Sequence, residues 1–357
     1  MPPIPTATEP LLRVRDLRVS FRMDEGTVRA VDGVSFDVFP SQVVGIVGES
    51  GCGKSVTMRA ILQLIDPPGR ITGGEILYRQ GATPKGGATP NGATPIDLAR
   101  LPPRGRMMRA LRGAEIALIP QEPMAAFSPV HTVGSQIIEA IMLHERRDGR
   151  PVGRDQARAM TVELFRDVGI SMPEQRIDAY SWQLSGGLRQ RAMIAMALSC
   201  KPRLLIADEP TTAIDVTTQA QILALLRALQ HKYQTAIIFI THDLGVIAQM
   251  ANHVVVMYLG RVMEEGPVDE IFHAPMHPYT RALLRSIPSL QTEVRAALPV
   301  IAGTLPHPFN QPQGCPFHPR CEDILRERCA TAIPALHSPK PRRAVSCFLH
   351  SDLAEPA

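Results

Sequence analysis

The amino-acid sequence predicts an α/β fold built on a parallel sheet, followed after about residue 270 by a small, irregular region. The segments QVVGIVG, RLLIAD and TAIIFI are continuous apolar runs, typical of strands buried on both faces, and a helical pattern separates the last two. The composition changes near the end, where 13 of the last 87 residues are proline and four of the six cysteines lie. We therefore expect one unit at 1–270 and a second at 271–357.

Local patterns predict the elements of the first unit. LLRVRDLRVSF and VDGVSFDVF alternate as short strands do, residues 54–65 have a helical pattern, and 122–183 are mostly helical. VVVMYLGRVMEEG reads as a hairpin with Gly260 near its turn. Residues 81–95 contain the tetrapeptide GATP three times and no apolar residue larger than alanine, so we expect a mobile surface insertion there.

Composition excludes several classes of protein. The chain has 357 residues, 45% of them hydrophobic, which excludes global disorder, and its net charge of +4 does not require a polyanionic partner. Six cysteines are too few for a disulfide scaffold in a chain of this length. No run reaches the roughly 18 apolar residues of a membrane span, and the N-terminus lacks the basic and apolar regions of a signal peptide. We expect a soluble, cytoplasmic protein.

A phosphate-binding loop is the first functional motif. GESGCGKS, at residues 48–55, fits the pattern G-x-x-x-x-G-K-[ST] and lies between a predicted strand and a predicted helix. Its glycines let successive backbone N–H groups surround a β-phosphate, Lys54 supplies a cation, and Ser55 can bind Mg²⁺. Residue frequencies give about one chance match per hundred chains of this length. The motif therefore predicts a nucleotide site.

RLLIADEP adds an acidic pair at the end of a buried strand. Asp208 can bind Mg²⁺, directly or through water, and Glu209 is placed to polarise a water molecule that attacks the γ-phosphate. Adjacent carboxylates at a loop are more often solvated surface charges. The preceding apolar run and the phosphate loop favour an NTPase instead.

LSGGLRQR, at residues 184–191, resembles the signature motif of ATP-binding cassette (ABC) ATPases, and the other motifs of that family occur in order over residues 11–270. The resemblance implies a P-loop NTPase core with an antiparallel β-subdomain and a helical subdomain at about 122–183. It also implies that ATP, with Mg²⁺, binds to Phe21, Gly48, Glu49, Ser50, Gly51, Cys52, Gly53, Lys54, Ser55, Val56, Ser185, Gly186, Gly187 and Asp215.

The same resemblance assigns roles to individual residues. Gln121 in IPQEP would sense Mg²⁺ and water and couple to membrane subunits, and His242 in FITHD would contact the γ-phosphate. Glu209 would act in hydrolysis, and Ser55, Gln121 and Asp208 would bind Mg²⁺. Taken singly, a loop glutamine, a helix-capping Ser185 and a strand-end histidine have simpler structural explanations. Phe21, the expected adenine platform, is placed by spacing alone.

The family mechanism also implies pairing, because each ATP lies between the phosphate loop of one subunit and the signature motif of another. One chain supplies one set of motifs, so it pairs with itself or, as we favour, with a sister ATPase. HAPMHPYTRALLRSIPSL, at 273–290, resembles the segment that follows the cassette in dipeptide, oligopeptide and nickel importer ATPases. This implies two permease subunits, an extracytoplasmic solute-binding protein that acts indirectly, and a peripheral place on the cytoplasmic face of the membrane.

Four cysteines cluster in the second unit: Cys315, Cys321, Cys329 and Cys347. Their gaps match neither a zinc knuckle nor a ferredoxin run, but clustered thiols in a reducing compartment are better explained as metal ligands than as disulfides. GCPFHPRC resembles peptide-importer ATPases, some of which hold an iron–sulfur cluster there. We rank a [4Fe–4S] cluster first, zinc with His318 or His350 second, and free thiols third.

The main alternative to an importer subunit is a soluble cassette ATPase that acts on nucleic acid or ribosomes. Such proteins usually join two cassettes or carry long coiled coils, and neither pattern occurs in this sequence. An aromatic content of 4% also gives no sign of a nucleic-acid groove, so we expect no nucleic-acid partner. The motifs face ATP rather than cargo, so the transported solute stays open among peptides, nickel, opine-like compounds and sugars.

Overall fold

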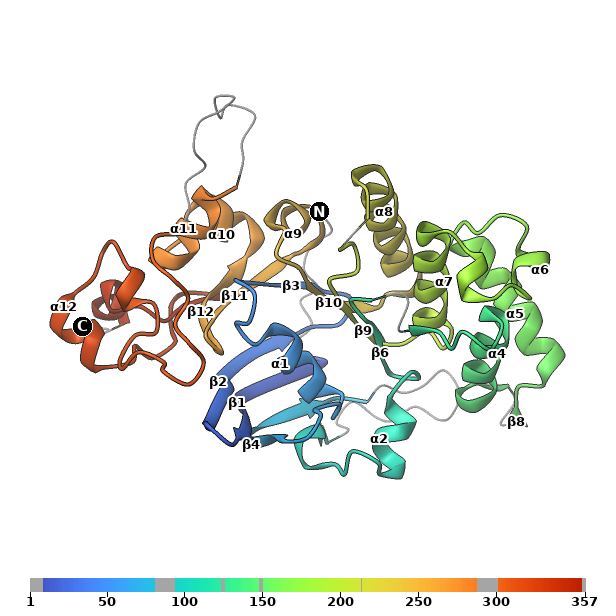
Figure 1. Ribbon diagram of the computed structural model, residues 1–357, viewed down its shortest axis with the longest axis horizontal. Helices are drawn as coiled ribbons and strands as arrows, with labels where there is room; N and C mark the ends of the chain where they lie inside the picture. Colours follow the sequence, from blue (N-terminus) through green and yellow to red (C-terminus); the bar gives the residue numbers. More distant parts are fainter. Residues whose placement is uncertain are drawn as a thin grey trace.

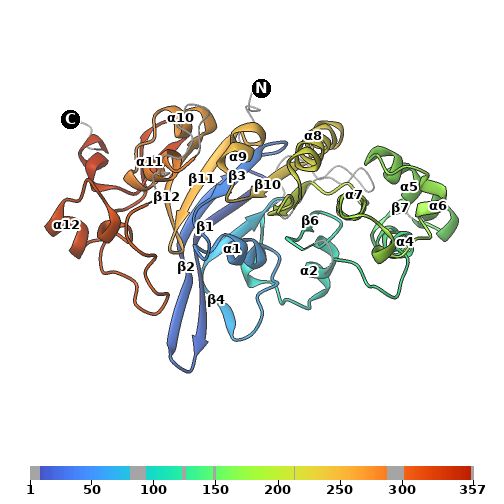
Figure 2. The same ribbon diagram turned by 45° about the horizontal axis from the view of Figure 1, so that its top comes forward.

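The fold was analysed in a computed structural model that describes residues 9–80, 94–122, 126–147, 150–212, 214–287 and 301–354. Two sheets occupy the middle of the molecule, a helical region that includes α4–α6 lies at one end, and the C-terminal region lies at the opposite end (Figures 1 and 2). Most of the GATP insertion, residues 81–93, lies outside the described residues. None of the described helices is long and apolar enough to cross a membrane.

The central sheet has eight strands in the order β13-β14-β12-β11-β3-β10-β9-β6. Its middle strands run parallel: β11 pairs with β3, β3 with β10, β10 with β9, and β9 with β6. Their bounds are Val43–Val47 for β3, Ile116–Ile119 for β6, Leu204–Asp208 for β9, Ala236–Ile240 for β10 and His253–Tyr258 for β11. β12, Arg261–Pro267, pairs antiparallel with β11 and completes the predicted hairpin around Gly260.

Both faces of this sheet are covered, which explains the continuous apolar runs. Val43 and Val47 of β3 belong to one core cluster, whereas Val44 and Ile46 belong to a second cluster on the other face. β9 and β10 alternate in the same way, and every residue of β3, β9 and β10 is buried. A strand with two buried faces is apolar along its length, as the sequence pattern predicts, and Asp208 is polar only at the very end of β9.

A second, antiparallel sheet forms the β-subdomain, with the strand order β2-β1-β4-β5. Its strands are Leu12–Met23 (β1), Gly26–Val38 (β2), Gly69–Tyr78 (β4) and Ile96–Asp97 (β5). The 3₁₀ turn η1, Leu98–Arg100, and helix α2, Arg106–Leu111, follow β5. The inner face of β1 contributes Leu12, Val14, Leu17 and Val19 to the second core cluster.

Helices α1 (Lys54–Ile61), α7 (Gly186–Leu198), α8 (Val216–Tyr233) and α9 (Leu244–Met250) accompany the central strands. Side-chain oxygens cap three of them: Ser185 accepts from the backbone N–H of Leu188, Asp215 from that of Thr218, and Asp243 from those of Gly245 and Val246. Such caps satisfy N–H groups that have no partner inside the helix. Helix α8 lies between β9 and β10, where the sequence shows the helical pattern.

The helical region contains α4 (Val133–His144), α5 (Arg154–Asp167), α6 (Pro173–Arg176) and the 3₁₀ turn η2 (Ser181–Gln183). It also includes a short antiparallel pair, β7 (Arg146–Arg147) and β8 (Arg150–Pro151), which the helical pattern did not predict.

The C-terminal region is joined to the central sheet rather than separate from it. Helices α10 (Val268–His273) and α11 (Pro278–Arg285) follow β12, and after residue 300 come η3 (His318–Arg320), α12 (Arg326–Thr331), β13 (His337–Lys340), β14 (Arg343–Val345) and η4 (Phe348–Ala354). β14 pairs antiparallel with β12 and so extends the sheet. The boundary expected near 270 stays a prediction.

A buried ion pair fixes this junction. Arg343 Nη2 donates to Glu264 Oε1 at 2.8 Å, and the two side chains are 1% and 0% exposed. Glu264 also accepts from the backbone N–H groups of Met276 and His277, at 2.8 and 2.9 Å. Arg343 Nη1 makes a second pair with Glu270 at 3.0 Å. One carboxylate on β12 thus connects β14 to the segment that enters α11.

We expect Arg343→Met to lower the free energy of unfolding by about 3–5 kcal/mol, because it leaves the Glu264 carboxylate buried without its cation. Urea denaturation of the full chain measures the change. Arg285→Gln is the matched control, since it removes an exposed pair with Glu322 and should cost less than about 0.5 kcal/mol. Equal, small effects of both substitutions would contradict this account of the junction.

Candidate nucleotide site

Four segments with candidate functional residues follow the carboxyl ends of four neighbouring parallel strands. Gly48 follows β3, Glu209 follows β9, His242 comes two residues after β10, and Gln121 two residues after β6. The register aligns Ile46 with Ile240, and Ile240 with Asp208. Because parallel strands end at one edge of the sheet, residues far apart in sequence meet there.

The phosphate loop is shaped by glycines at positive φ. Gly48 has φ +150°, Gly51 +79° and Gly53 +97°. A Cβ at Gly48 would lie 2.1 Å from the carbonyl oxygen of Met257, and one at Gly53 would lie 2.3 Å from that of Ala30. Side chains larger than hydrogen are therefore excluded at both positions, as the motif requires.

Lys54 lies buried inside the loop. Its Nζ donates to the carbonyl oxygens of Gly48 and Glu49, at 2.8 and 3.0 Å, and lies 3.6 Å from Cys52 Sγ. Burial raises the pKa of the Cys52 thiol, and this wholly buried side chain fills space inside the loop. The loop therefore holds the ammonium group of Lys54 with two of its own carbonyl oxygens.

The Mg²⁺ ligand candidates lie side by side. Ser55 Oγ donates to Asp208 Oδ1 at 3.0 Å, joining the start of α1 to the end of β9. Burial raises the pKa of Asp208, and the hydrogen bond from Ser55 partly offsets this effect. A hydroxyl and a carboxylate are the hard oxygen ligands that Mg²⁺ prefers, so the donor set fits the ion.

Glu209 is the centre of a small polar cluster. Its Oε2 accepts from Gln121 Nε2 and from Thr212 Oγ1, both at 2.9 Å, and its Oε1 lies 3.4 Å from His242 Nδ1. The backbone of Glu209 has φ +47°, in the left-handed region that is rare for residues with a side chain. The structure thus brings together all three residues that the sequence analysis placed in catalysis, and adds Thr212.

The signature residues lie elsewhere. Ser185 and Gly186 are exposed at the start of α7, with Gly187 partly buried, and α7 lies apart from α1 in both views (Figures 1 and 2). Asp215 caps α8 through Thr218. The Phe21 ring lies beside Gly69 on β4, next to Ile65. The structure does not bring these residues into contact with the phosphate loop.

The four C-terminal cysteines line one small, mostly apolar cavity together with His277 and Phe317. Burial raises the pKa of Cys315 to about 12 and that of Cys347 to about 11. Nevertheless, among the described residues no group of three or more His, Cys, Asp or Glu side chains is placed to hold a metal ion. Cys200 packs at the end of α7, where its Sγ lies 3.7 Å from the carbonyl oxygen of Ala140.

The sequence analysis did not find a polar link between the C-terminal region and the phosphate loop. Arg320 pairs with Glu49, and the hydroxyl of Tyr279 accepts from the Glu49 backbone N–H at 3.0 Å. Tyr279 and Arg320 lie in HPYTRALL and GCPFHPRC, two segments identified by their resemblance to a family. No spacing rule places either segment near residue 49.

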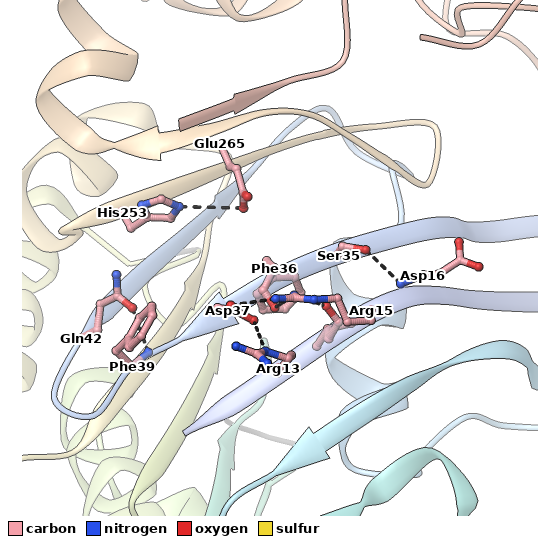
Figure 3. Close-up of polar contacts among 11 residues, drawn as sticks. Arg13, Arg15, Asp16, Ser35, Phe36, Asp37, Phe39, Gln42, His253 and Glu265 are labelled. Atoms are coloured by element: carbon pink, nitrogen blue, oxygen red, sulfur yellow. Dashed lines mark hydrogen bonds and ion pairs between the residues drawn. The ribbon is translucent and has the colours of Figure 1, made fainter. Parts of the chain in front are cut away.

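A separate cavity of about 490 Å³ lies between β2, the β11–β12 hairpin and the strands of the C-terminal region. Its charged side chains pair within the wall (Figure 3): Arg15 donates to Asp37 at 2.8 Å, and His253 lies 3.8 Å from Glu265. Gln42 accepts from the Phe39 backbone N–H at 2.9 Å. Since these groups bind one another, we assign the cavity no ligand.

A phosphate loop that faces an acidic pair at the edge of a parallel sheet defines the protein as a P-loop nucleotide-binding protein. Residues 31–212 match the family model described as ABC transporter, and residues 263–329 match the one described as oligopeptide/dipeptide transporter, C-terminal region. The chain therefore belongs to the ABC transporter family and carries the C-terminal region of its oligopeptide/dipeptide members. It is an ATPase.

Relatives and solved structures agree with this assignment. The chain is 44% identical over 96% of its length to the probable peptide ABC transporter ATP-binding protein y4tR of Sinorhizobium fredii, covering 96% of that protein. It is also 44% identical to the dipeptide transport ATP-binding protein DppD of Bacillus subtilis, over 98% of this chain and 97% of that one. The fold matches the dimeric ATP-binding cassette MJ0796 bound to ADP and Pi, with a TM-score of 0.60 and 22% identity, over 72% of this chain and 98% of that one.

We expect Gly48→Ala to lower the free energy of unfolding by about 3 kcal/mol or more, because it adds a backbone clash to a strained φ. Gly51→Ala is the matched control: it also has a positive φ, but its Cβ would meet no atom within 4 Å, so about 1 kcal/mol is expected. Urea denaturation without nucleotide measures both. Equal losses would mean that the packing around Gly48 does not shape the loop.

Proposed function

We propose that the protein binds MgATP at residues 48–56 and hydrolyses it with Glu209 as the general base. The observation that carries this proposal is the cluster in which Gln121, Thr212 and His242 surround the Glu209 carboxylate, beside the Ser55–Asp208 pair. Glu209 polarises the attacking water, and His242 contacts the γ-phosphate. Ser55, Asp208 and Gln121 would hold Mg²⁺, which would neutralise charge on the phosphates.

Hydrolysis requires a second subunit in this proposal. Ser185, Gly186 and Gly187 form an exposed helix start, which suits an anion bound to a partner. Two large apolar side chains near the signature motif and Asp215 are also exposed: Trp182 is 61% exposed and Val216 82%. Such side chains favour a protein interface at this face. We favour a sister ATPase over a second copy of the chain as the partner.

Glu209→Gln should allow ATP-dependent dimerisation while lowering the turnover rate at least about 100-fold, because an amide cannot accept the proton of the attacking water. Light scattering with and without ATP measures the assembly, and phosphate release measures turnover. Thr212→Val is the control for loss of a hydrogen bond to Glu209, and it should reduce turnover far less. Unimpaired hydrolysis by Glu209→Gln would remove Glu209 from the role of base.

We propose further that ATP hydrolysis drives import of di- or oligopeptides, or of a related solute such as nickel, through two permease subunits. Relatives named for dipeptide and oligopeptide transport support this cargo class. The exposed side chains of Met142 and Leu143 on α4 line a groove of about 680 Å³, which offers a docking surface for permeases. The chain would then lie peripherally on the cytoplasmic face of the membrane, and a solute-binding protein would deliver cargo outside.

Purification of the tagged protein from gently solubilised native membranes tests this role. Two permease chains, a sister ATPase and a solute-binding protein are expected among the co-purifying proteins. Leu143→Asp should remove the permeases, because it places a charge on the docking surface, whereas Met107→Asp, at an exposed site on α2, should not. Recovery with ribosomes or nucleic acid from the soluble fraction would contradict the transport role.

Finally, we propose that Cys315, Cys321, Cys329 and Cys347 hold a [4Fe–4S] cluster, with zinc, assisted by His318 or His350, as the second choice and free thiols as the third. The support is that these four residues line one cavity in the C-terminal region. When bound, the cluster would supply four iron–thiolate bonds that tie this region together. The ATPase mechanism uses no step at this site.

Anaerobic reconstitution with iron and sulfide tests the cluster. The wild-type chain should bind about four iron atoms and absorb near 400 nm, and Cys321→Ser should lose most of both signals. Cys200→Ser, outside the cavity, should keep them. Stoichiometric zinc without visible absorption would support the second choice. If the chain binds neither iron nor zinc, the third choice, free thiols, is supported.

A further inference from the structure

Arg320 of the C-terminal region reaches the phosphate loop. Its Nη1 donates to Glu49 Oε2 at 2.7 Å and its Nη2 to Glu49 Oε1 at 3.0 Å, a two-pronged pair between residues 271 positions apart. The Arg320 side chain is 5% exposed and that of Glu49 is 26% exposed. A pair of this geometry and burial is stronger and more directional than a surface ion pair.

The same region holds the backbone of Glu49. Tyr279 Oη accepts from the Glu49 N–H at 3.0 Å, and Tyr258 Oη lies 3.2 Å from Arg320 Nη1. Phe317, from the segment that leads to Arg320, packs with its ring centroid 5.4 Å from that of Tyr258 and 5.2 Å from that of Tyr279. The guanidinium and the hydroxyl that bind Glu49 are thus fixed by one aromatic cluster.

Glu49 in turn positions the cation of the site. Its carbonyl oxygen accepts from Lys54 Nζ at 3.0 Å and from the Cys52 N–H at 3.3 Å. A shift of Glu49 would therefore move both the loop backbone and the lysine that serves the phosphates.

The charge of Glu49 needs neutralisation. A carboxylate in a loop that binds a polyanionic nucleotide repels it, and this repulsion is strongest at low ionic strength, where salt screens it least. The guanidinium of Arg320 cancels that charge. If the pair only stabilised the fold, breaking it would lower the free energy of unfolding without a matching loss of affinity for ATP.

We propose that Arg320 is a positioning residue of the nucleotide site: by pairing with Glu49 it neutralises and orients the phosphate loop, so that the C-terminal region sets the affinity for MgATP. This inference rests on the proposed nucleotide site. It does not depend on the permease partners or on metal at the cysteines.

Equilibrium titration of the full chain with MgATP tests the inference, at 0.05 and 0.5 M KCl. Arg320→Gln should raise the Kd about tenfold or more at low salt, because it exposes the nucleotide to an unpaired carboxylate, and this loss should shrink at high salt. The double variant E49Q/R320Q, which removes both charges, should return the Kd to within about threefold of wild type. Arg285→Gln breaks an exposed ion pair to the same region without touching the loop, and it should leave the Kd unchanged.

Urea denaturation without nucleotide identifies variants that fail to fold. If Arg320→Gln is among them, Arg320→Lys replaces it in the titration. The proposal then requires the Kd of Arg320→Lys to rise severalfold at low salt, because one ammonium group cannot make the two parallel hydrogen bonds of the guanidinium to Glu49. A folded variant with the Kd of wild type would overturn the proposal. A double variant that binds MgATP as weakly as Arg320→Gln would also overturn it, because removing the charge of Glu49 would then restore no affinity. Failure of the wild-type chain to bind MgATP would instead overturn the proposed nucleotide site.

Discussion

The shared edge of four parallel strands is the constraint on which the site depends. β3, β10, β9 and β6 are bound in register by backbone hydrogen bonds, so the loops after neighbouring strands start about one strand spacing apart along the same edge. The phosphate loop, the Asp208–Glu209 pair, His242 and Gln121 each occupy one of these loops. No side-chain contact is needed to bring them together, and the contacts between them, such as Ser55 to Asp208, adjust an arrangement that the backbone already imposes.

Around this edge the molecule combines strain with rigid support. Gly48 at φ +150° and Glu209 at φ +47° lie directly after strands that are wholly buried. A strained loop keeps its shape only where its ends cannot move, and buried strands provide such ends. The C-terminal region adds a further hold, because Arg320 and Tyr279 bind the first residue after Gly48. The site is thus supported from the sheet beneath it and from a segment almost at the other end of the chain.

The sequence predicts those parts of the fold that depend on local periodicity. The buried strands, the β11–β12 hairpin and helix α8 have clear patterns, and Asp215 before α8 is a typical capping residue. The helical pattern over 122–183 missed β7 and β8, which are two residues each and too short to show alternation. HSPK and RAV, the segments of β13 and β14, are likewise too short to be predicted as strands. The motifs predicted that Gln121, Glu209 and His242 belong to one site, whereas the pair Arg320–Glu49 depends on tertiary packing that no spacing rule describes. The assigned roles of these residues stay predictions.

The pairing of β14 with β12 has a consequence for the solubility of the chain. Without β14, β12 would present the unpaired N–H and C=O groups of Glu264 and Glu265 at the edge of the central sheet, beside the buried Val262 and Met263. Exposed edges of this kind recruit strands from other molecules. The C-terminal segment therefore terminates the sheet, and a chain shortened before residue 343 would expose an edge strand that favours aggregation.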